Sequence, residues 1–88
     1  MPAAVLGRLP GTYRSDEAGW TIVVRRDAGR LYARENDSTV DIELIALTET
    51  RYLGSGLPAP IEFTLPEKGA ATRLVSLELE EIALDRVP

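Results

Sequence analysis

The chain has 88 residues, a net charge of −4, 44% hydrophobic residues, and neither cysteine nor histidine. A chain of this length forms one domain with a small core, and its acidic balance argues against nucleic acid as a partner, since binding a phosphate backbone needs a basic face. Without cysteine there is no disulfide or thiolate chemistry, and without histidine the commonest general base and transition-metal ligand is missing.

The sequence predicts a single domain over residues 1–88, in which residues 1–8 form a loosely ordered N-terminal arm. The apolar stretch of this arm, Ala3 to Leu6, is shorter than the core of a secretory signal. No run in the chain approaches the roughly 18 apolar residues of a membrane span. We therefore expect a soluble chain without a membrane-spanning segment.

Apolar and polar residues alternate with a period of two in the first half of the chain, and short polar turns interrupt them. Strands are predicted over residues 11–14, 20–25 and 31–34. Asp27-Ala28-Gly29 and Asn36-Asp37-Ser38 supply the turns, because Gly, Asn and Asp tolerate the backbone of short hairpins. The alternation places one set of side chains in the core: Trp20, Ile22, Val24, Leu31 and Ala33.

Residues 40–47 are the most apolar stretch and admit two interpretations. Ile42 and Leu44 alternate with acidic residues as in a strand. Residues 45–47 are three apolar residues in a row, which interrupts the alternation, so a helix is the alternative prediction for this stretch. The β-branched content and the short breaks on both sides favour the strand.

Four more strands are predicted in the second half, over residues 51–53, 61–65, 75–79 and 82–84. In residues 75–79 the apolar phase consists of Val75, Leu77 and Leu79. Eight strands at roughly eleven-residue spacing predict an all-β fold. We expect an antiparallel up-and-down meander that closes into a small lipocalin-like barrel, with two packed sheets as the alternative.

No residue is predicted to be catalytic or to hold a metal or cofactor. The four serines have no histidine to act as a base, and Lys68, the only lysine, lies in no Ser-x-x-Lys spacing. Asp41 with Glu43, and Glu78 with Glu80, alternate along predicted strands, which places both pairs on a solvated face. The sequence therefore favours a binding or interaction role over an enzyme.

A candidate interaction patch consists of Val23, Tyr32 and Ile45, with Leu47 beside them. These side chains fall on the phase opposite the core. If neighbouring strands bring them together, they form an exposed apolar surface of the kind that marks a protein contact.

The alternative site is a cavity for a small apolar ligand between Trp20, Tyr52 and Phe63. The interior of a small barrel is either filled by side chains or wide enough for one such ligand. The two hypotheses differ in prediction, because the patch predicts docking or self-association and the cavity predicts ligand binding.

The order of several short motifs resembles a known family. A Gly-x-Tyr strand opens the domain at Gly11, a Gly-Leu hairpin follows at Gly29-Arg30-Leu31, Ile61-Glu62-Phe63 precedes a turn at Gly69, and Arg86 lies near the end. Over residues 9–87 the chain resembles the small C-terminal β-barrel domain appended to β-lactamase-like serine hydrolases of the penicillin-binding-protein and peptidase class.

This resemblance implies a lipocalin-like fold and an accessory role. In that family the catalytic serine and lysine belong to the preceding hydrolase domain, so no catalytic residue is carried over to this chain. The implied partners are a serine-hydrolase catalytic domain or further copies of this chain. We expect a non-catalytic module that acts through protein contact or oligomerisation.

Overall fold

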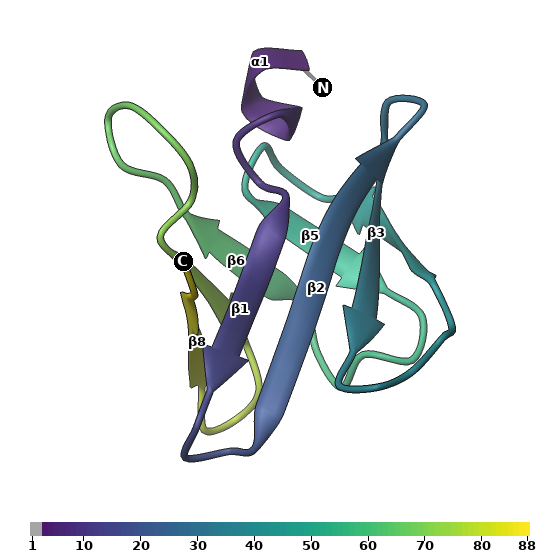
Figure 1. The fold of residues 1–88 in the computed structure, drawn as a ribbon, viewed down its shortest axis with the longest axis vertical. Coiled ribbons are helices and arrows are strands. Elements are labelled where there is room, and N and C mark those ends of the chain that lie inside the picture. The colour runs from purple at the N-terminus through teal and green to yellow at the C-terminus, as the bar shows by residue number, and fades with distance from the viewer. Residues whose placement is uncertain (1–2) are drawn as a thin grey trace.

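A computed structural model describes residues 3–88, and Figure 1 shows its fold, a single-layered β-barrel. The elements are the helix α1 (Ala3–Leu6) and the strands β1 (Gly11–Ser15), β2 (Trp20–Asp27), β3 (Arg30–Glu35), β4 (Ile42–Ala46), β5 (Arg51–Gly54), β6 (Ile61–Thr64), β7 (Arg73–Ser76) and β8 (Ile82–Arg86). Each strand pairs antiparallel with the next, and β8 pairs with β1. The predicted all-β meander closing into a barrel is confirmed, and the 40–47 stretch contains the strand β4 rather than a helix.

The barrel interior is filled by apolar side chains. The predicted core residues of β2 and β3 are all buried, since alternate residues of a strand point to opposite faces of a sheet. Aromatic rings occupy the centre, where Phe63 makes edge-to-face contacts with Tyr13 and with Tyr52, each at a centroid distance of 5.7 Å.

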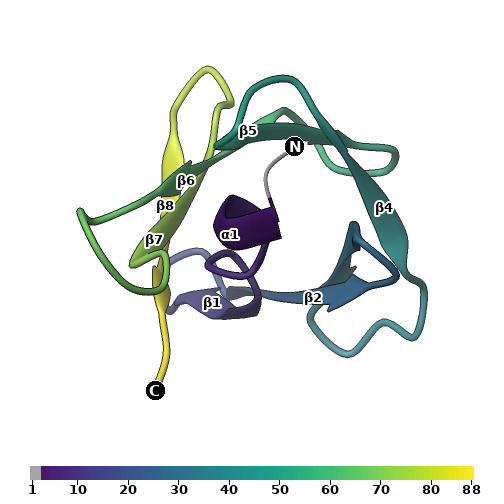
Figure 2. The same cartoon turned by 90° about the horizontal axis from the view of Figure 1, so that it is seen from above.

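The segment before β1 lies over one end of the barrel: α1 stands beyond the strand ends in Figure 1 and falls within the outline of the ring of strands when seen from above in Figure 2. The sequence predicts a loosely ordered arm over residues 1–8. Within it, residues 1–2 lie outside the described residues, and Ala3–Leu6 form α1. This segment contacts the barrel, since Leu6 is buried in the core and the Arg8 carbonyl accepts a 2.8 Å hydrogen bond from Ala71 N–H.

Arg86 closes the seam between β1 and β8. Its Nη2 donates to the Pro10 carbonyl and to the Tyr13 hydroxyl, both at 2.8 Å, and its Nε donates to the Ala71 carbonyl. A Cβ at Gly11 would overlap the Arg86 guanidinium, so a larger residue there would displace the guanidinium from these hydrogen bonds. Tyr13 in turn donates from its hydroxyl to the Leu9 carbonyl at 2.5 Å, which ties the seam to the covering segment.

The seventh strand differs from its prediction in position and in phase. It spans Arg73–Ser76, and the buried side chains are Leu74 and Ser76 rather than Val75, Leu77 and Leu79. The register with β6 decides this, because Leu74 lies opposite Phe63 and shares its inward face. Leu79 is fully exposed in the connection to β8.

Four connections lie at the end of the barrel opposite α1 (Figure 1). We call this end, which lies away from the segment before β1, the open end. The four connections are residues 16–19, 36–41, 55–60 and 77–81. Within residues 3–88 no helix has the length and apolar character needed to span a bilayer.

Candidate functional site

The three residues of the predicted patch lie on the outer surface of neighbouring strands. Val23 on β2 lies opposite Arg34, and Tyr32 on β3 lies opposite Arg25 on one side and Glu43 on the other. Ile45 on β4 is 54% exposed and Val23 is 37% exposed, whereas Tyr32 is half-buried. The three side chains share the outer face of the barrel, and the residues directly opposite Val23 and Tyr32 on the neighbouring strands are charged.

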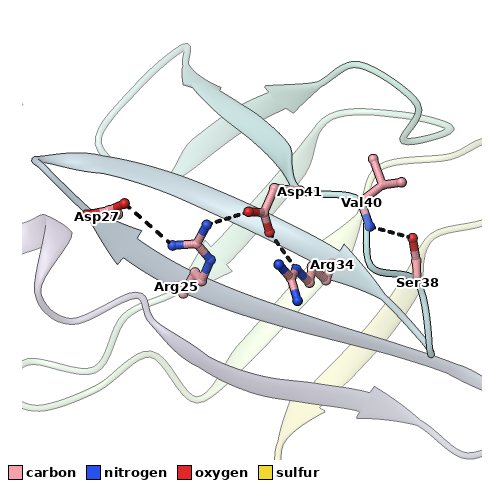
Figure 3. Close-up of polar contacts among 6 residues, drawn as sticks. All are labelled: Arg25, Asp27, Arg34, Ser38, Val40 and Asp41. Carbon is pink, nitrogen blue, oxygen red and sulfur yellow. Dashed lines mark hydrogen bonds and ion pairs between the residues drawn. The ribbon is translucent and has the colours of Figure 1, made fainter.

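An ion-pair network joins Arg25, Arg34 and Asp41 on this outer surface (Figure 3). Asp41 Oδ1 accepts a 2.6 Å bond from Arg34 Nε, and Asp41 Oδ2 accepts one from Arg25 Nη2. The Arg25 guanidinium also lies 4.9 Å from the centroid of the Tyr32 ring, within the range of a cation–π contact. Tyr32 is therefore partly covered by Arg25 and adds little free apolar surface.

The electrostatics of this network follow from its geometry. The hydrogen bond from Arg25, together with the one from Arg34, lowers the pKa of the Asp41 carboxyl from 3.8 to about 2. Ser38 shapes the preceding connection, since its Oγ accepts a 3.1 Å bond from Val40 N–H and positions the chain just before Asp41 (Figure 3). The network joins β2, β3 and the start of β4 on the barrel wall.

Further exposed apolar side chains lie over β4 and β5. Ile45 and Leu53 are direct cross-strand partners, and Leu47 continues the outward phase of β4 just past its end. Their exposed fractions are 54%, 43% and 50%. We call these three side chains the β4–β5 strip.

The sequence prediction found two members of this strip and missed the third. Ile45 and Leu47 were identified from the outward phase, but Leu53 was not. Leu53 could have been predicted as outward from its position directly after the inward Tyr52, because neighbouring residues of a strand face opposite sides.

The three residues of the predicted ligand cavity separate into two regions. Tyr52 and Phe63 contact each other in the filled core. Trp20 lies at the open end, where its Nε1 donates a 2.9 Å hydrogen bond to Glu35 Oε2. The structure thus brings Tyr52 together with Phe63, and it places Trp20 beside a different set of residues.

Two surface hollows receive side chains from these regions. Trp20 lines a hollow of about 340 Å³ at the open end, together with Glu35, Asn36, Pro58, Glu78 and Ile82. Tyr52 lines a hollow of about 210 Å³ near α1, together with Leu6, Leu31 and Leu44. Trp20 and Tyr52 therefore line different hollows.

Two further observations concern the polar groups of the barrel. Ser76 is fully buried, and its Oγ donates a 2.9 Å hydrogen bond to Glu78 Oε2. Over residues 3–88 no group of three or more acidic side chains lies close enough to hold a metal ion.

Comparisons of the chain with protein-family models, with curated proteins and with solved structures find no match. The fold itself defines the class, a small closed antiparallel barrel of eight strands.

Proposed function

We propose that this barrel is a non-catalytic interaction module that associates with a second copy of itself through the β4–β5 strip. The observation that carries the proposal is the strip: three large apolar side chains that adjoin on one outer face with about half of each exposed. Contiguous exposed apolar surface on a small domain marks a contact site, whereas scattered apolar residues do not.

The surroundings of the strip have the arrangement of an interface rim. Arg30 Nη1 lies 3.6 Å from Glu43 Oε2 on one side, and Arg51 Nε lies 2.7 Å from Glu62 Oε1 on the other. An apolar centre with charged residues at its border is the usual anatomy of a protein interface. A self-complementary contact of this kind joins two copies about a two-fold axis.

The size of the strip sets the expected affinity. Burying the exposed half of three such side chains gives about 1 kcal/mol each, or about 6 kcal/mol when two strips face each other. Association costs several kcal/mol of rigid-body freedom, so only part of this energy appears as affinity. We therefore expect a weak, reversible dimer.

The family resemblance supports the same kind of role. The motif order from Gly11 to Arg86 resembles accessory barrels of β-lactamase-like serine hydrolases, which the resemblance implies act by contact rather than by chemistry. The absence of histidine and cysteine and the burial of Ser76 agree with a non-catalytic module.

A charge placed in the strip tests the proposal. Leu53→Glu should abolish self-association, because a carboxylate would have to be desolvated at the centre of the contact. Leu79→Glu is the matched control, since it places the same charge on a fully exposed leucine at the open end. Sedimentation equilibrium should show the wild type and Leu79→Glu associating with rising concentration and Leu53→Glu remaining a monomer. Equal association of all three proteins, or a wild type that stays monomeric, contradicts the proposal.

A further inference from the structure

The Trp20 hollow combines an aromatic wall with two carboxylates. Trp20, Pro58 and Ile82 provide apolar surface, and Glu35 and Glu78 provide the charge. Its volume of about 340 Å³ lies at the lower end of the range for ligand sites, which suits one long side chain.

Both carboxylates are held in place by groups of the barrel. Glu35 Oε2 accepts from the indole of Trp20 and Glu78 Oε2 accepts from the hydroxyl of Ser76, each at 2.9 Å. A carboxylate accepts more than one hydrogen bond, so each retains capacity for a further donor. The hollow thus contains two oriented acceptors.

These carboxylates differ from those of the barrel wall. On the wall, carboxylates pair with arginines, as in Arg51–Glu62 and Arg73–Asp85 at 2.7 and 2.8 Å. Glu35 and Glu78 make no ion pair with any Lys or Arg of residues 3–88. Both side chains are half-buried and line the same hollow, so a cation in the hollow would lie beside two carboxylates that have no other cationic partner among the described residues.

The charge around the hollow has the same sign. The four connections of the open end contain seven of the fourteen acidic residues and none of the ten basic ones. The seven are Asp16, Glu17, Asp37, Asp41, Glu78, Glu80 and Glu81. Asp16 pairs with Arg14, and Asp41 pairs with Arg25 and Arg34 on the wall, so five of the seven make no ion pair with a Lys or Arg of residues 3–88. Such a surface attracts a basic partner and repels an acidic one.

We infer that the Trp20 hollow binds an arginine or lysine side chain from a basic segment of a partner polypeptide. The methylene stem of such a side chain packs on Trp20 and Ile82, and its cationic head donates to Glu35 and Glu78. The fully exposed Leu79, next to Glu78 in the chain, offers apolar contact to the neighbouring residues of the segment. The acidic connections then meet further basic residues, which favours a segment over a free amino acid.

Trp20 is the only tryptophan, so its fluorescence reports directly on the hollow. The probe is a capped Gly-Arg-Gly-Arg-Gly peptide, and the matched probe carries citrulline in place of arginine. The inference predicts a saturable change with the arginine peptide that weakens as salt rises, and no change with the citrulline peptide. A flat titration with the arginine peptide, equal binding of both peptides, or equally tight binding of free arginine overturns it.

Charge-neutralising variants locate the binding. Glu35→Gln and Glu78→Gln should each lower the affinity for the arginine peptide about tenfold, the loss expected for one charge-assisted hydrogen bond. Glu67→Gln removes the same charge from the β6–β7 connection at the α1 end and should bind as the wild type does. An equal loss in Glu67→Gln, or no loss in either hollow variant, contradicts a specific site.

The inference is independent of the β4–β5 strip. Leu53→Glu should bind the arginine peptide as tightly as the wild type, because the strip lies on the wall and the hollow at the open end. Self-association and peptide binding therefore fail or succeed separately. Circular dichroism of each variant confirms that the barrel is intact before its affinity is compared.

Discussion

At the scale of single residues, Asp41 shows how arginines organise the outer wall. One carboxylate receives hydrogen bonds from Arg25 and Arg34, whose strands are adjacent, and Arg25 also contacts the Tyr32 ring. The same contacts that stabilise the ionised carboxylate remove Tyr32 from the free apolar surface. The position of the proposed interaction site on the β4–β5 strip thus depends on an ion-pair network as much as on the apolar residues.

The lowered pKa of Asp41 makes a contribution to stability that depends on pH. Its pKa is about 2 in the folded chain against an ordinary value of 3.8, so the contribution is present above the ordinary value. It is lost as the pH falls from about 3.8 towards 2, when the carboxylate is protonated. Asp41→Asn should therefore show a smaller loss of unfolding free energy than the wild type across this interval, measured by urea denaturation at several pH values. An identical pH dependence of the two proteins would contradict the role of Asp41.

At the scale of elements, the alternation of side chains predicted where the strands lie. It also predicted which side chains of β2 point inward, but it predicted the wrong inward side chains for β7. In β2 the inward Ile22 and Val24 fit one phase, because the opposite phase contains the polar Thr21 and Arg25. In the stretch from Leu74 to Leu79 both phases contain leucine, so local alternation does not decide between them. Pairing with β6 decides, and no single-strand pattern contains that information.

The same limit applies to the candidate site. Ile45 and Leu47 could be predicted because an outward phase is a local property. The cover of Arg25 over Tyr32, and the approach of Glu35 to Trp20, depend on which residues of two strands lie opposite each other. That register is set by pairing along the whole meander.

The phase of β7 has a direct consequence for stability. Leu74→Ala should destabilise the barrel by about 2–4 kcal/mol, because it removes a buried side chain opposite Phe63. Leu79→Ala, which shortens a fully exposed side chain, should change the unfolding free energy by less than about 0.5 kcal/mol. Chemical denaturation distinguishes them, and the reverse order would contradict the observed register.

At the scale of the whole molecule, the barrel separates two kinds of surface. The wall over β4 and β5 is apolar at its centre with paired charges around it, and the open end is acidic around an aromatic hollow. The α1 end is closed by the covering segment and by Arg86. A rigid closed barrel keeps these surfaces in fixed positions, which suits a module that contacts one partner on its wall and another at its end.

The most direct test of the central claim is an NMR dilution series on the wild-type protein. Amide spectra recorded between about 10 μM and about 1 mM cover the range in which a weak dimer forms. The account predicts concentration-dependent shifts centred on Ile45, Leu47 and Leu53, with the open-end residues around Trp20 unchanged. Spectra that do not change with concentration, or shifts centred away from β4 and β5, would contradict the claim that the strip joins two copies.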